Sequence, residues 1–132
     1  MGYGDKEIIA ELPSRIASSK ILFVGLRNWE RKEIIVRQKQ YGIPHLAPKD
    51  VAQNSDAVKC WLKTCGASKV LIHFDMDVLD PSEIVAAVGT DPEGMKMEEV
   101  IRVINDIAVE KEIVGLTIAE PMPRTAIRIK DM

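Results

Sequence analysis

Two aspartates separated by one residue, Asp75 and Asp77, are the feature of this sequence that most strongly suggests chemistry. They follow an apolar run, residues 69–74 (KVLIHF), which predicts a buried strand. On extended backbone, side chains at positions i and i+2 point to the same side, and His73 is on that side too. Two adjacent carboxylates repel each other, so one stays protonated or a cation lies between them. Carboxylate oxygens favour hard cations such as Mg²⁺, Ca²⁺ or Mn²⁺, whereas a nearby imidazole shifts the choice toward a transition metal.

The residues around this pair have simpler interpretations. Asp80, followed by Pro81, is typical of a turn or a helix cap. We interpret His73 as a hydrogen-bonded side chain rather than as a direct metal ligand. Three aspartates within six residues, Asp75, Asp77 and Asp80, nevertheless follow a wholly apolar strand, and this spacing predicts a metal or phosphate role.

Alternating strands and helices must position these residues. Buried strands are predicted where short apolar runs occur: residues 20–26, 69–74 and 112–119. Helical patterns fall between or before them: residues 6–16, 30–41, 50–65 and 97–109. Residues 43–46 predict a fourth, shorter strand, which Pro44 would confine to an edge. This alternation predicts an α/β fold with a mainly parallel sheet, formed as one domain over residues 1–132.

Charged side chains follow the predicted strands at the point where each ends. Arg27 follows the first strand, Asp75 and Asp77 follow the second, and Glu120 follows the third. Ligands of open parallel sheets bind outside the carboxyl ends of the strands. We therefore expect these groups, most of them carboxylates, to gather at one edge of the sheet.

Composition excludes several classes of function. The 132 residues carry a formal net charge of −2, whereas a dedicated nucleic-acid binder would usually show a basic excess. No apolar run approaches the roughly 18–20 residues of a membrane span, and the N-terminus has no signal-peptide core. Cys60 and Cys65 form no disulfide framework, so we expect free thiols in a reducing compartment, the cytoplasm.

Three segments together resemble one known family. Residues 73–81 (HFDMDVLDP) closely resemble the Asp-x-Asp-x-x-Asp-Pro motif of the arginase family, the ureohydrolases, which includes arginase, agmatinase and formimidoylglutamase. Residues 115–123 (GLTIAEPMP) resemble the family's late strand, which ends in a glutamate, and residues 24–27 (VGLR) resemble an earlier strand. The loop at residues 87–94 also matches. The resemblance implies a partial arginase-like fold with three α/β/α layers.

The resemblance also implies an activity. Members of this family are manganese hydrolases, in which two metal ions activate a bridging water that attacks a guanidinium or formimino carbon. Carried over by position, Asp75 and Asp77 would be metal ligands, with Asp75 bridging, and Glu120 would face the cationic group of a small guanidino or formimino substrate. Thr117 stands where arginases often carry an acidic residue, and His73 where many members carry a small hydroxyl residue.

The sequence departs from the family where further ligands are expected. The Gly-Gly-Asp-His and Asp-x-His-x-Asp segments of the family are missing from these 132 residues. We therefore expect the C-terminal part of a ureohydrolase-like enzyme, with no catalytic residue assigned, weak binding of at most one Mn²⁺ and no activity of the isolated chain. We also expect a homo-oligomer, because a sheet without its N-terminal strands has an unpaired edge.

Two other classes of function fit the same pattern. A receiver-type phosphoacceptor domain would share the length, the α/β alternation and the aspartates at strand ends. Against it, no acidic pair follows the first predicted strand, and Glu120 stands where a lysine is expected. The other alternative is a non-catalytic interaction module. The presence of both Asp75 and Asp77 argues against it.

Overall fold

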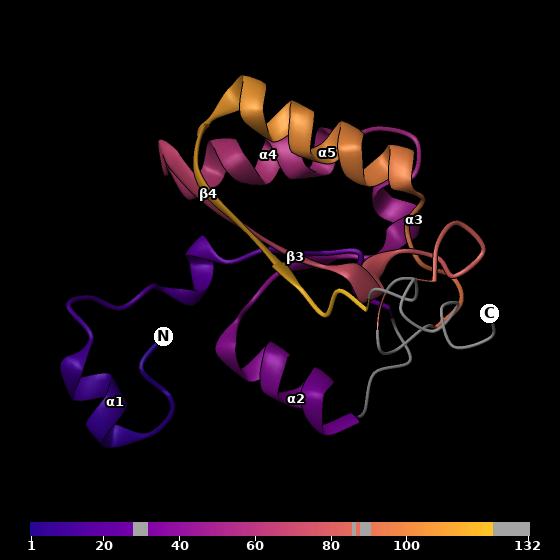
Figure 1. Ribbon diagram of the computed structural model, residues 1–132. Coiled ribbons are helices and arrows are strands. Elements are labelled where there is room, and N and C mark those ends of the chain that lie inside the picture. Colours follow the sequence, from indigo (N-terminus) through magenta and orange to yellow (C-terminus); the bar gives the residue numbers. More distant parts are fainter. Residues whose placement is uncertain (28–31, 86, 88–90, 123–132) are drawn as a thin grey trace.

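Helices and parallel strands alternate along the chain in a computed structural model that describes residues 1–27, 32–85, 87 and 91–122 (Figure 1). The helices are α1 (Lys6–Glu11), α2 (Lys32–Tyr41), α3 (Pro48–Val51), α4 (Asp56–Cys65) and α5 (Met97–Glu110), with short 3₁₀ turns η1 (Ser18–Lys20) and η2 (Met76–Val78). The strands are β1 (Phe23–Val24), β2 (His45–Leu46), β3 (Lys69–Asp75) and β4 (Glu112–Ala119). The α/β prediction is confirmed.

The strands form two parallel pairs among the described residues. β1 pairs with β2, and β3 pairs with β4 from Lys69↔Glu112 to Asp75↔Ala119, with a shift of register between Val70 and Leu71. Helices α4 and α5 lie on one side of the strands and α2 lies on the other (Figure 1). This is the three-layer order that the sequence led us to expect.

The core lies between the β3–β4 pair and the helices α4 and α5. Leu62 and Val58 of α4 are almost fully buried, and they belong to one apolar cluster with Val103 and Ile107 of α5. A salt bridge between Lys59 and Asp106, with Nζ 3.3 Å from Oδ1, joins the two helices beside this cluster. Helix packing therefore holds β3 and β4, whose ends carry the candidate site.

Burial of the strands differs from the prediction. Val70, Ile72 and Phe74 of β3 are partly buried against the core, whereas Leu71 between them is 66% exposed. The expectation of strands covered on both faces is thus wrong for β3 in the described part of the chain. A continuous apolar run does not reveal which of its two faces a neighbour covers.

Local sequence explains where the helices end. The first covers only the part of the 6–16 pattern that precedes Pro13, the residue expected to interrupt it. It stops before Leu12, which is extended (ψ 128°) because a residue that precedes proline avoids helical backbone. The single helix expected over residues 50–65 is divided into α3 and α4. Asn54 accepts a hydrogen bond from the backbone N–H of Asp56 (2.9 Å), which forms a turn and restarts the helix. Gly66 then ends α4 with left-handed backbone (φ 66°).

The first strand is also shorter than its apolar run. β1 comprises Phe23 and Val24 because η1 occupies the beginning of the run and Gly25 has positive φ (85°). A side chain at Gly25 would lie 2.8 Å from Sδ of Met95, so the backbone passes close to a neighbouring segment here. Within the described ranges, no helix has the length and apolar character needed to cross a membrane.

Candidate metal centre

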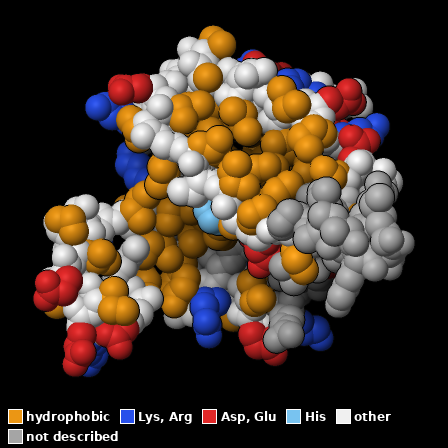
Figure 2. Space-filling model, in the orientation of Figure 1, with side chains coloured by type: hydrophobic (Ala, Val, Ile, Leu, Met, Phe, Trp, Pro, Cys, Tyr) orange, Lys and Arg blue, Asp and Glu red, His pale blue; other side chains and the backbone are white. Residues whose placement is uncertain are grey.

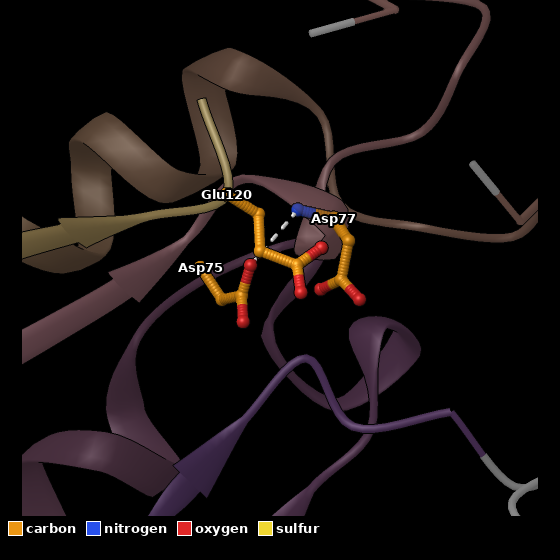
Figure 3. Close-up of side chains that lie close together, drawn as sticks. All are labelled: Asp75, Asp77 and Glu120. Carbon is orange, nitrogen blue, oxygen red and sulfur yellow. Dashed lines mark hydrogen bonds between the residues drawn. The ribbon is translucent and has the colours of Figure 1, made fainter. Parts of the chain in front are cut away.

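Asp75 and Asp77 lie at the carboxyl end of β3, where the chain turns. Asp75 is the last residue of the strand, and its carboxylate accepts a long hydrogen bond from the backbone N–H of Asp77 (3.5 Å), capping η2 (Figure 3). Asp77 therefore lies on a 3₁₀ turn and not on extended backbone as the i, i+2 argument assumed. The two carboxylates nevertheless remain close, because the cap folds the turn back onto the end of the strand.

Glu120 completes a group of three carboxylates. It follows Ala119, which pairs with Asp75 in the parallel register, so the two strands end next to each other. Asp75, Asp77 and Glu120 each offer one oxygen, and these oxygens lie within 4.8 Å of one another (Figure 3). Glu120 has left-handed backbone (φ 53°), which is uncommon for a residue with a side chain.

Repulsion and burial act on this cluster together. The pKa of Asp77 is raised, first by partial burial of its carboxyl group and next by the negative charge of Asp75, while the positive charge of Arg27 lowers it. Three converging carboxylates without a countercharge among them are stabilised by a cation. The donor set consists of oxygens, which fits a hard divalent ion.

Asp80 has a structural role, as its turn pattern predicted. Its carboxylate accepts hydrogen bonds from the backbone N–H (2.9 Å) and hydroxyl (2.5 Å) of Ser82 and from the backbone N–H of Gly94 (3.1 Å). The hydrogen bonds from Ser82 are the main cause of its lowered pKa. With its oxygens engaged in this way, Asp80 is not in the carboxylate cluster.

His73 is also outside the cluster. It is exposed, and its Nδ1 lies 2.7 Å from the hydroxyl oxygen of Thr117 on the neighbouring strand. The structure thus places His73 as a hydrogen-bonded side chain beside the site.

Arg27 has contacts that the sequence did not reveal. Its guanidinium donates to backbone carbonyls of two loops, including that of Asp77 (2.8 Å). Its position after an early strand indicated that it lies at the same sheet edge. Because its acceptors are backbone carbonyls, no residue type in the sequence marks them.

Comparison with known proteins identifies the family of this chain. A family model described as the Arginase family matches residues 8–130. The chain belongs to the arginase family.

Individual relatives agree with this assignment. An arginase of Eremothecium gossypii is 26% identical over 123 residues, covering 89% of this chain and 31% of that protein. The crystal structure of Entamoeba histolytica arginase in complex with L-ornithine superimposes with a TM-score of 0.77 at 22% identity, covering 93% of this chain and 43% of the other. Formimidoylglutamase of Bacillus subtilis gives a TM-score of 0.76 at 20% identity, covering 89% and 37%. The solved structures show the common fold, and this chain spans less than half the length of each of these relatives.

The arginase-family match includes the segments whose motifs resembled that family. It does not favour the receiver-type alternative. Residues 88–90 of the matching loop and residue 123 of the late segment lie outside the described residues. The site geometry reported above therefore rests on Asp75, Asp77 and Glu120, which are all described.

Proposed function

We propose that this chain is the C-terminal part of a manganese-dependent ureohydrolase, which hydrolyses guanidino or formimino C–N bonds of small substrates. The observation that supports this proposal is the convergence of Asp75, Asp77 and Glu120 at the carboxyl ends of two parallel strands. Membership of the arginase family supports the reaction class. The three carboxylates supply the negative charge that both a divalent ion and a cationic substrate require.

In this proposal the three acidic residues have different roles. Asp75 and Asp77 are the metal ligands, since they are partly buried and lie on consecutive parts of one turn. Asp75 would hold the metal from the end of the strand, and Asp77 would hold it from the turn that follows. Glu120 is exposed, so its carboxylate can face the guanidinium or formimino group through charge-assisted hydrogen bonds. Bound manganese would supply Lewis acidity and a hydroxide nucleophile near neutral pH.

The isolated chain is proposed to bind metal weakly. The cluster in the described part of the chain contains three carboxylates and no histidine or cysteine, which is too few donors for two ions. Water would have to complete the coordination of a single ion. We therefore expect at most one Mn²⁺ per chain, a dissociation constant on the order of 10⁻⁴ to 10⁻³ M, and no urea release from arginine or agmatine.

Titration calorimetry with Mn²⁺ tests the metal site directly. The variant carrying Asp75→Ala and Asp77→Ala should lose all binding heat. A matched control, Glu7→Ala with Glu11→Ala, removes the same charge from exposed positions of α1, away from the strand ends (Figure 1), and should bind like the unmodified chain. Equal binding by the aspartate variant would refute the metal site. A colorimetric urea assay tests the expected lack of activity. Vigorous manganese-dependent hydrolysis by this chain would contradict the proposal that its metal site is incomplete.

We also propose a reducing compartment, the cytoplasm. Cys60 is exposed and Cys65 is buried, and both are free thiols. Their separation on α4 directs them to different sides of the helix, so they cannot pair with each other. An exposed thiol persists most readily where disulfides are kept reduced.

A further inference from the structure

The guanidinium of Arg27 joins two loops near the carboxyl end of β3. Nη2 donates to the backbone carbonyls of Asp77 (2.8 Å), Leu79 (3.3 Å) and Asp91 (3.0 Å), and Nε donates to the carbonyl of Pro92 (3.2 Å). Two of these acceptors lie in the turn that carries the Asp77 carboxylate, and the other two lie in the segment before α5. One side chain thus bridges backbone 50 to 65 residues away from it in the sequence.

These contacts depend on the shape of the arginine side chain. The planar fork of guanidinium N–H groups can donate in several directions at once, whereas a lysine ammonium on a flexible stem cannot reproduce that geometry. Among the described residues, no salt bridge joins Arg27 to a carboxylate. The guanidinium is therefore committed to the carbonyls, which places its charge beside the turn without neutralising the metal-binding oxygens directly.

The two loops are also joined to each other directly, by backbone hydrogen bonds beside this guanidinium. The backbone N–H of Met95 donates to the carbonyl of Val78 (2.8 Å), and that of Asp80 donates back to the carbonyl of Met95 (2.9 Å). A side-chain carbon at Gly94 would lie 2.5 Å from Nη2 of Arg27, closer than such atoms are found. The absence of a side chain at Gly94 thus leaves room for Arg27 between the loops.

We propose that Arg27 is a positioning residue of the metal site: it fixes the turn 76–79 against segment 91–92 and so holds the Asp77 carboxylate beside Asp75. This inference rests on the proposed function for the metal itself. The part that concerns the turn does not, because it is argued only from the hydrogen bonds between Arg27 and the two loops.

Hydrogen–deuterium exchange of the full chain, combined with Mn²⁺ titration, tests the proposal. In Arg27→Lys and Arg27→Ala, amides of residues 76–80 and 91–95 should exchange about tenfold faster or more, while amides of α4 and α5 keep their rates. Affinity for Mn²⁺ should fall about 10- to 100-fold, the usual effect of removing a group that orients a metal ligand. The matched control is Arg37→Lys, at an exposed position of α2, which should change neither measurement.

The outcomes test the positioning role of Arg27 separately from the proposed metal site. Unchanged exchange in both loops of the Arg27 variants would overturn the positioning role, whether or not metal binds. Faster exchange throughout the chain would also overturn it, since Arg27 would then be a general stabilising residue. Faster exchange in the loops with unchanged Mn²⁺ affinity would reject control of the metal ligand. If the unmodified chain binds no Mn²⁺, the proposed metal site of this chain fails, and the exchange data still establish or refute the bridge between the loops.

Discussion

Nδ1 of His73 and the hydroxyl oxygen of Thr117 lie 2.7 Å apart across the β3–β4 pair. The two residues are partners in the parallel register, two pairs before the last, so they lie just behind the carboxylate cluster. The hydroxyl engages one ring nitrogen of the histidine, and His73 lies outside the group of potential ligands. His73 is therefore a neighbour of the carboxylate cluster and not one of its potential metal ligands.

Replacing His73 should therefore affect metal binding little. We expect His73→Asn to change the Mn²⁺ affinity by less than about threefold, well below the 10- to 100-fold loss typical of a partner that orients a ligand. Calorimetric titration measures this, with Asp75→Ala as the comparison that should abolish binding. A loss in His73→Asn as large as in Asp75→Ala would make the histidine a ligand.

Without metal, the chain with Asp77 should be less stable at neutral pH than the variant Asp77→Asn. The folded-state pKa of Asp77 is raised, so the stability contributed by its protonated form is fully present below the unfolded pKa of about 3.9 and is lost as pH rises through the folded value. Asp77→Asn should consequently raise the free energy of unfolding at pH 7 by about 0.5 kcal/mol, the size expected for a partly exposed pair of charges. Urea denaturation without metal measures it.

The control for this prediction is the same comparison at low pH. Near pH 3 the aspartate is itself protonated, so the advantage of Asp77→Asn should disappear. A destabilising effect of the asparagine at pH 7 would contradict the repulsion within the cluster.

Gly94 should tolerate no side chain. The added carbon of Gly94→Ala would lie 2.5 Å from the backbone nitrogen of Asp80 and 2.6 Å from the carbonyl carbon of Leu79, neither of which is a flexible group. We expect a loss of about 1–3 kcal/mol in the free energy of unfolding, as for other overpacked positions. Gly4→Ala is the matched control, because the nearest atom to its added carbon would be 3.8 Å away. Equal denaturation midpoints for the two variants would contradict the close approach of the loops.

Association of the chain with itself is expected from the β3–β4 pair. Leu71, Leu116 and Ile118 are each more than half exposed, and Figure 2 shows hydrophobic side chains gathered over the centre of the view, where these strands cross in Figure 1. Apolar surface together with unpaired strand edges favours pairing with another chain. Light scattering should detect a dimer or a larger oligomer. Leu116→Lys should shift it toward the monomer, and Ile8→Lys on α1 should not.

A stable monomer at high protein concentration would contradict this prediction. A shift caused equally by Leu116→Lys and Ile8→Lys would also contradict it, because the effect would then not be specific to the strand pair.

The sequence by itself determined the order of the elements and the position of the acidic residues. Apolar runs predicted β3 and β4, Gly66 ended α4, and the pattern of Asp80 followed by Pro81 predicted a turn. These features depend on neighbours within a few residues, where backbone preference and side-chain spacing act directly. The aspartates and Glu120 could also be assigned to one edge, because each directly follows a predicted strand and parallel strands end at the same edge.

Tertiary structure decided how these residues meet. It placed Asp77 on a 3₁₀ turn, gave Glu120 left-handed backbone, and set the guanidinium of Arg27 on carbonyls of two distant loops. It also left Leu71 exposed within an apolar strand. Every residue has a backbone carbonyl, and an apolar run has the same composition whichever of its faces is covered. Such contacts are fixed by the path of the chain in space, and no local pattern of residue types specifies them.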